Sequence, residues 1–181
     1  MLLLLLLLLL LPPSLSFPPP PPPRFTLSLP ALQITVRTVG KAPKGSNNGW
    51  ITEGYEQYRT RLKPAGVDLD TVRHRDDEDL EEKVRGDLKK GHAVILLDPK
   101  GETLTSERFA STTYKALESG GSRLTFVIGG AAGLPPLLLS DAAYPRVTLS
   151  ALTFTHQFAL VLLAEQVYRA AEIRKGSGYH K

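Results

Sequence analysis

Three short segments of this chain carry glycines or polar side chains directly after apolar runs. They are residues 97–101 (Leu-Asp-Pro-Lys-Gly), residues 128–133 with Gly129 and Gly130, and residues 148–154. In open parallel sheets, ligands bind at the carboxyl ends of the strands, and glycine lets the backbone approach a ligand closely or adopt a positive φ. The three segments are therefore candidate binding loops, although each one alone is equally well explained as a tight turn.

The chain lacks the residues for several other kinds of chemistry. It has no cysteine, which excludes disulfides, thiolate catalysis and cysteine-based zinc sites. There is no GxGxxG dinucleotide motif, no GxxxxGK[ST] phosphate loop and no GxSxG nucleophile elbow. The four histidines show no metal-ligand spacing: His74, His92, His156 and His180. We therefore expect no metal and no serine hydrolase or P-loop chemistry.

The net charge of +4 at pH 7, with a pI near 9.4, favours a polyanionic partner such as nucleic acid. Mild basicity is also common in proteins that bind no polyanion, so charge alone leaves both interpretations open.

The first 30 residues differ in composition from the rest. Residues 2–11 are all leucine, prolines follow, and no acidic residue precedes Glu53. This run is too short for a membrane-spanning helix, which needs about 20 residues, and proline would end such a helix. An acid-free apolar leader is typical of a processed targeting peptide. We predict a leader over residues 1–30, addressed to a plastid or mitochondrion, and one domain over residues 31–181. There are two alternative explanations for these residues: a secretory signal that lacks its usual basic flank, or translation from another start.

Strand-like and helix-like patterns alternate along the domain. Ala93–Leu97 and Leu124–Ile128 are continuous apolar runs, as expected for strands that are buried on both faces of a parallel sheet. The predicted strands are 32–39, 67–72, 93–97, 124–128 and 146–149, and the predicted helices are 50–62, 76–90, 106–119, 136–143 and 154–173. This order predicts an α/β fold with a mainly parallel sheet flanked by helices.

Several blocks near the C-terminus resemble one family. They are residues 149–157 (Leu-Ser-Ala-Leu-Thr-Phe-Thr-His-Gln), residues 161–170 (Val-Leu-Leu-Ala-Glu-Gln-Val-Tyr-Arg-Ala) and residues 178–181 (Gly-Tyr-His-Lys). Together with the two apolar runs and their following loops, they resemble the RlmH-type enzymes of the SPOUT class over residues 32–181. Enzymes of that family methylate N3 of a pseudouridine in 23S large-subunit ribosomal RNA. With its leader, the chain resembles an organellar member, such as one from a plant.

The resemblance implies a fold, a cofactor and a partner that composition does not show. SPOUT enzymes form a C-terminal trefoil knot, an exception to the rule that chains are unknotted. The knot binds S-adenosyl-L-methionine, and the family works as a homodimer with its pockets at the dimer interface. The implied substrate is ribosomal RNA within the large subunit, with no membrane partner. The implied cofactor contacts are Leu97, Gly129, Leu149, Ser150, Ala151, Leu152, Thr153 and Phe154.

The same resemblance, together with residue chemistry, selects catalytic and RNA-binding candidates. An imidazole is the side chain best suited to exchange a proton at physiological pH, which makes His156 and His180 candidates, and Tyr179 can orient the target base. Alternatively, His156 only starts a helix and bonds to backbone. Arg169 and Lys181 are the candidates for contacts to RNA, although Arg169 can also pair with Glu165 at i, i+4.

Two positions depart from the family pattern. Ala151 stands where lysine is common, and Leu160 stands where arginine is common. Either basic residue could bind RNA phosphate, so these departures bear on substrate affinity and target choice. The competing hypotheses are a non-catalytic ribosome-binding or assembly factor that has kept the fold, and a nucleotide-binding oxidoreductase.

Overall fold

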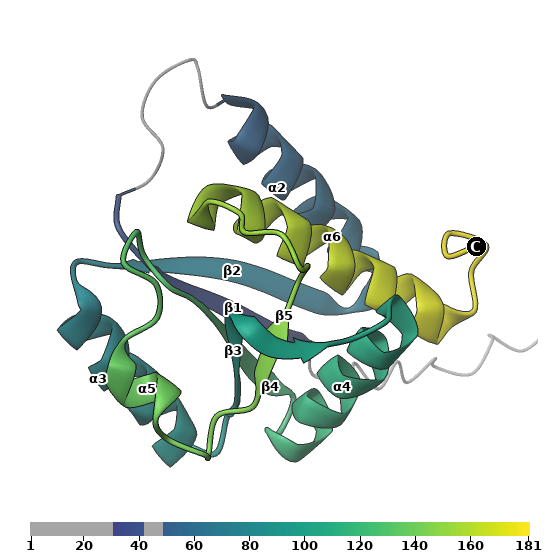
Figure 1. The fold of residues 1–181 in the computed structure, drawn as a ribbon. Coiled ribbons are helices and arrows are strands. Elements are labelled where there is room, and N and C mark those ends of the chain that lie inside the picture. The colour runs from purple at the N-terminus through teal and green to yellow at the C-terminus, as the bar shows by residue number, and fades with distance from the viewer. Residues whose placement is uncertain (1–30, 42–48) are drawn as a thin grey trace, which may run out of the picture.

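The computed structural model describes residues 31–41 and 49–181, so the predicted leader lies outside it. Five parallel strands form one sheet in the order β2-β1-β4-β3-β5 (Figure 1). Their bounds are β1 Leu32–Val39, β2 Val67–His74, β3 Ala93–Thr103, β4 Arg123–Ile128 and β5 Arg146–Thr148. The predicted α/β fold with a parallel sheet is confirmed.

Helices cover both faces of the sheet and make three layers (Figure 1). One face carries α2 (Gly49–Leu62), α4 (Ser106–Ser119) and α6 (His156–Lys175), and the other carries α3 (Asp77–Lys89) and α5 (Pro136–Leu139). The 3-10 turn η3 (Lys63–Ala65) follows α2 directly. None of the helices in the described ranges combines the length and hydrophobicity that a membrane span requires.

The core is split by the sheet because neighbouring residues of a strand face opposite sides. Ile34 and Phe126 pack beneath α2, α4 and α6, whereas Leu96 and Val127 pack with Leu80 beneath α3 and α5. Each of these side chains is almost fully buried, which contributes roughly 1.5–3 kcal/mol per residue. Burial on both faces explains why the strands read as continuous apolar runs.

A buried ion pair ties α3 to the sheet. Asp87 of α3 accepts hydrogen bonds from Arg37 Nε (2.7 Å) and Nη2 (2.9 Å) on β1 and from the Thr125 hydroxyl (2.7 Å) on β4. Burial disfavours the charged carboxylate, but the bonds from Arg37 and Thr125 outweigh it, so the pKa of Asp87 lies below its ordinary value. This network holds the helical layer farthest from α6.

Several element bounds differ from the prediction, most of all those of the third strand and of the short helix α5. The strand that begins at Ala93 does not end at Leu97 but continues to Thr103, because residues beyond a bulge pair again with β5. The helix predicted over residues 136–143 is only α5, Pro136–Leu139. The last helix starts at His156, after Thr155 caps it by accepting a bond from the Phe158 amide.

Candidate active site

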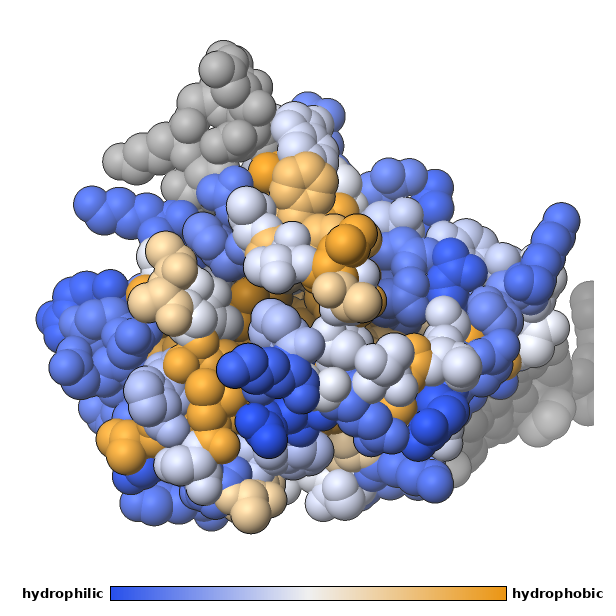
Figure 2. All heavy atoms as spheres, viewed as in Figure 1, coloured by the Kyte–Doolittle hydropathy of each residue, from blue (hydrophilic) through white to orange (hydrophobic). Residues whose placement is uncertain are grey.

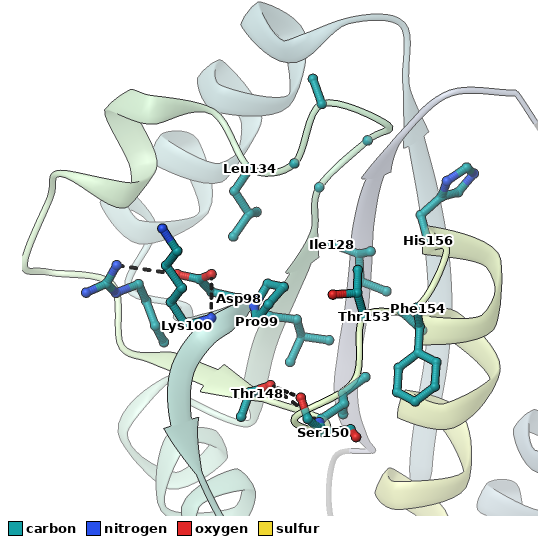
Figure 3. A pocket seen from close by; sticks show the side chains of 18 of the residues that line it. Asp98, Pro99, Lys100, Ile128, Leu134, Thr148, Ser150, Thr153, Phe154 and His156 are labelled. Atoms are coloured by element: carbon teal, nitrogen blue, oxygen red, sulfur yellow. Dashed lines mark hydrogen bonds and ion pairs between the residues drawn. The ribbon is translucent and has the colours of Figure 1, made fainter.

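The three candidate loops meet at one pocket. It lies at the carboxyl ends of β3, β4 and β5, beside the start of α6, with a volume of about 460 Å³ (Figure 3). The predicted cofactor contacts that line it are Leu97, Gly129, Leu149, Ser150, Leu152, Thr153 and Phe154. The structure therefore brings together segments that are about 50 residues apart in the sequence, and it supports the expectation that ligands bind at this edge of the sheet.

Gly129 is needed for a different reason from the one expected. It does not have a positive φ; instead, a Cβ at this position would collide with the backbone of Gly133 and Leu134. The loop folds back on itself through a bridge between Gly130 and Gly133, whose φ is +91°. Glycine is thus required for the loop to close, and this closed loop forms one wall of the pocket.

The loop after β5 is held by its own side chains. The Thr148 hydroxyl donates to the Ser150 carbonyl (2.7 Å), and the Leu152 amide donates to the Ser150 hydroxyl (3.0 Å). Hydrogen bonds of this local kind order a loop without secondary structure. Ala151 is exposed and is not part of the pocket lining, unlike its neighbours.

The lining suits a nucleoside joined to an amino-acid chain. Side chains such as Leu97, Ile128 and Leu149 give apolar walls, and loop backbone supplies donors and acceptors, as in most small-molecule sites. The volume also lies within the range of roughly 300–1,000 Å³ that is usual for such pockets. The residues present therefore fit the expected S-adenosyl-L-methionine. No group of three or more metal-ligating side chains occurs within residues 31–41 and 49–181.

His156 lies at the pocket, as its predicted role requires. It is the first residue of α6 and belongs to the pocket lining, on the side opposite Lys100 and Asp98 (Figure 3). Within the described part of the chain its ring has no hydrogen-bond partner, so the structure does not show the backbone-bonded histidine of the alternative interpretation. Its ring is half-buried and accessible from the cavity.

Tyr179 and His180 lie far from this pocket. They follow the C-terminal end of α6, a helix of 20 residues that is therefore about 30 Å long. The Tyr179 hydroxyl donates to Glu165 (3.1 Å), and the His180 Nε2 lies 2.7 Å from Glu107 Oε1 on α4. Within one chain, His156 thus lies at the start of α6, whereas Tyr179 and His180 fold back to contact Glu165 and Arg169 farther along the helix and do not line the pocket.

The contacts of the tail set its protonation. Burial and the bond to Glu165 raise the pKa of Tyr179 to about 12, so its hydroxyl remains a neutral donor at physiological pH. The bond from His180, together with bonds at the start of α4, lowers the pKa of Glu107 to about 2. The tail therefore presents a phenol and an imidazole that are held by two carboxylates.

Arg169 connects the helix to the tail. Its Nη2 lies 2.6 Å from Glu165 Oε1, so the predicted i, i+4 pair exists. Its guanidinium also lies 4.9 Å from the centre of the Tyr179 ring and 3.4 Å from His180 Nδ1. Lys181 is exposed at the chain end. Arg169 is thus part of the tail assembly, in addition to being a candidate for contact with RNA.

Leu160, which stands where arginine is common in the family, is buried in the core. It is 4% exposed and packs in the core below α2, next to a hollow that Tyr55 and Thr71 also line. In this chain the position serves packing, because the leucine side chain belongs to the core.

Sequence reasoning missed four charged residues near the two regions. Lys100 and Arg146 line the pocket, and Asp98 lies between them. Glu107 contacts the tail. Lys100 and Asp98 belong to the candidate binding loop 97–101, whose polar residues could have indicated them. Arg146 and Glu107 could not be found in this way, because they meet their partners only through strand order and helix packing.

Comparisons with known proteins agree with this architecture. The family model described as "Predicted SPOUT methyltransferase" matches residues 32–180. The chain is 42% identical over 150 residues to ribosomal RNA large subunit methyltransferase H of Protochlamydia amoebophila, covering 83% of this chain and 99% of that protein. It is 39% identical over 143 residues to the protein of the same name from Synechococcus sp., covering 79% and 92%.

A solved structure of a probable methylase family protein from Haemophilus influenzae matches with a TM-score of 0.46 at 13% identity, covering 82% of this chain and 70% of that one. The parallel sheet with a loop-built pocket at one edge is the arrangement in which α/β proteins bind ligands. On the sequence matches, the chain belongs to the SPOUT methyltransferase family.

Proposed function

We propose that this protein transfers a methyl group from S-adenosyl-L-methionine to N3 of a pseudouridine in large-subunit ribosomal RNA. The observation that carries the proposal is the convergence of residues 97–101, 128–133 and 148–154 on one pocket, inside the region that the family model matches. The names of the relatives, which are large-subunit ribosomal RNA methyltransferases, support the substrate class.

Each part of the pocket has a task in this reaction. When bound, S-adenosyl-L-methionine supplies an electrophilic methyl group. The apolar walls and the two loops exclude water and fix the orientation of reactants, which accounts for a large share of catalysis in such transfers. His156, at the pocket edge, is placed to accept the N3 proton of the target base. Tyr179 and His180 would hold that base from the other side.

The proposal requires a second copy of the chain, because Tyr179 and His180 contact Glu165 and Arg169 farther along α6 and do not line the pocket of their own chain. An apolar surface beside the pocket supports such pairing (Figure 2). Trp50 and Phe158 are 50% and 45% exposed, with ring centroids 5.0 Å apart, and Leu152 and Phe154 of the pocket lining are also exposed. Exposed apolar patches of this kind mark interaction sites.

The primary test is mass spectrometry of large-subunit ribosomal RNA from cells with and without the protein. We expect one pseudouridine to lose its methyl group in the cells that lack it. Re-expression of the full chain should restore the methyl group, and a Thr153→Arg variant should not, because a cation in the lining repels the sulfonium cofactor. If the level of unmethylated pseudouridine is the same in cells with and without the protein, the result would favour a ribosome-binding factor that lacks this activity.

The two-copy arrangement is tested by mixing two inactive variants. One variant carries Thr153→Arg with its tail intact, and the other lacks residues 179–181 but keeps its pocket. Random exchange should restore roughly a quarter of wild-type activity, because about half of the dimers are mixed and each holds one intact site. Absence of any restored activity in demonstrably mixed dimers would contradict the sharing of sites between copies.

We also propose that residues 1–30 direct the protein to a plastid or mitochondrion. The family match begins only at residue 32, and the preceding residues have the acid-free apolar composition of a leader. A fusion of residues 1–40 to a fluorescent protein should accumulate in one of these organelles. A secreted or diffuse cytosolic signal would contradict this proposal without affecting the enzymatic one.

A further inference from the structure

Strand β3 contains a bulge next to the pocket. Val147 of β5 pairs with both Leu97 and Glu102, so the intervening residues 98–101 stand outside the ladder. Gly101 allows this arrangement, since a Cβ there would lie 2.6 Å from the Val147 nitrogen. Bulges beside active sites commonly re-aim a side chain, and the residue displaced here is Lys100.

A buried carboxylate organises this bulge. Asp98 is 8% exposed, and its Oδ1 accepts a hydrogen bond from the Lys100 backbone amide at 2.9 Å. Its Oδ2 lies 3.3 Å from Nη1 of Arg146, at the start of β5. One side chain thus fixes the backbone that carries Lys100 and also holds Arg146 beside it.

The rim of the pocket is positively charged as a result. The titratable residues that line the pocket are Asp98, Lys100, Arg146 and His156. The Asp98 charge is matched by Arg146, and no carboxylate within the described part of the chain forms an ion pair with Lys100. Lys100 and Arg146 are both exposed, and Lys100 and His156 lie on opposite sides of the pocket (Figure 3).

We propose that Lys100, with Arg146 beside it, binds a phosphate of the substrate RNA at the pocket rim and thereby positions the target nucleotide. This inference rests on the proposed function. The rim location favours RNA over the carboxylate of the cofactor, because both cations are exposed to solvent, where a large substrate can reach them. A lysine acts as a mobile point charge and the arginine as a directional donor, and both suit a phosphate.

The test compares Lys100→Met with Lys115→Met in the full chain. Both changes remove one exposed positive charge and keep an apolar stem, but Lys115 lies on α4 outside the pocket lining. Affinity for purified large ribosomal subunits is measured over a series of KCl concentrations, and affinity for S-adenosyl-L-methionine is measured by calorimetry.

We expect Lys100→Met to weaken subunit binding roughly tenfold and to reduce the slope of log K against log salt by about 0.7–0.9. Its cofactor affinity should match wild type, and Lys100→Arg should restore subunit binding. Lys115→Met should leave both quantities unchanged.

Two outcomes would overturn the inference. Weaker cofactor binding with unchanged subunit binding would assign Lys100 to the cofactor carboxylate instead. Equal behaviour of Lys100→Met and Lys115→Met would show that Lys100 contacts neither ligand. A wild-type chain that binds subunits without methylating pseudouridine would refute the proposed function, while the binding comparison would still decide the role of Lys100.

Discussion

Different kinds of interaction shape the two regions that adjoin the start and the end of α6. At its start, the pocket is shaped by backbone: a glycine loop that closes on itself and a loop held by Thr148 and Ser150. At its end, the tail is held by charged side chains, with Glu165 on Tyr179 and Glu107 on His180. Loops that are shaped by their backbone cannot be altered without distorting the pocket, whereas a C-terminal tail held by a few side-chain contacts can be removed with little effect on folding.

This difference indicates that the pocket and the tail have different tasks in the proposed reaction. A pocket that must enclose a small molecule benefits from a fixed backbone, since preorganisation lowers the cost of binding. A tail that meets a large substrate needs donors and acceptors in defined protonation states. The following variants separate the two regions, and the expected effects decrease from the first to the last.

Gly129→Val should have the largest effect, because its side chain collides with the backbone of Gly133 and Leu134. We expect cofactor binding and methylation to become undetectable. Calorimetry measures binding, and circular dichroism establishes whether the sheet still forms. If only the loop is affected, the tail contacts should survive. Normal methylation by this variant would show that the glycine loop is not part of the site.

Deletion of residues 179–181 should reduce turnover by roughly 100-fold or more, because the substrate loses its orienting groups. The cofactor dissociation constant should not change, since none of residues 179–181 lines the pocket and Tyr179 contacts Glu165, which lies nine residues, or about 14 Å, along α6 from His156. The midpoint of thermal unfolding should change little because exposed ion pairs contribute only about 0–1 kcal/mol. A large loss of cofactor affinity would mean that the two regions are not separate.

Asp87→Asn tests a third region, on the face opposite α6. Removing the partner of Arg37 should lower the free energy of unfolding by roughly 3 kcal/mol at pH 7, measured by urea denaturation, without changing cofactor affinity under native conditions. Because the pKa of Asp87 is depressed in the folded state, its contribution is complete above the ordinary value of 3.8 and is lost as pH falls through the lower folded value. Plots of the free energy of unfolding against pH for the mutant and the wild type should therefore converge only below pH 3.8. Parallel curves across that range would contradict this role.

Glu107→Gln should have the smallest effect. The pKa of this carboxyl falls from 4.5 to about 2, so the wild-type contact to His180 is complete above pH 4.5 and weakens only as pH falls towards 2. We expect single-turnover methylation at neutral pH to slow by roughly threefold, as for an exposed ion pair. Glu118→Gln, an exposed position near the other end of α4, is the matched control. Equal rates for the two variants would show that Glu107 does not position the tail.

Much of the fold could be predicted because it is written in local patterns. Buried strands appear as apolar runs and helices as 3.6-residue periodicity, whereas Asp76 and Thr155, which the prediction placed inside helices, cap the helices that follow them. The predicted helix over residues 106–119 agrees with α4. The predicted ends of elements were wrong where pairing between strands decides them. The segment after Leu97 continues as a strand only because β5 pairs with it beyond the bulge.

The candidate site divides in the same way. The sequence by itself determined the binding loops, His156 and the tail, because each is a contiguous motif. Only the tertiary structure decided that the loops form one pocket, that the tail lies at the other end of α6, and that Asp98 joins Lys100 to Arg146. It also showed that Gly129 is needed for loop closure. The physical reason is that these features depend on which strands lie side by side, and strand order arises from long-range packing that no local pattern encodes.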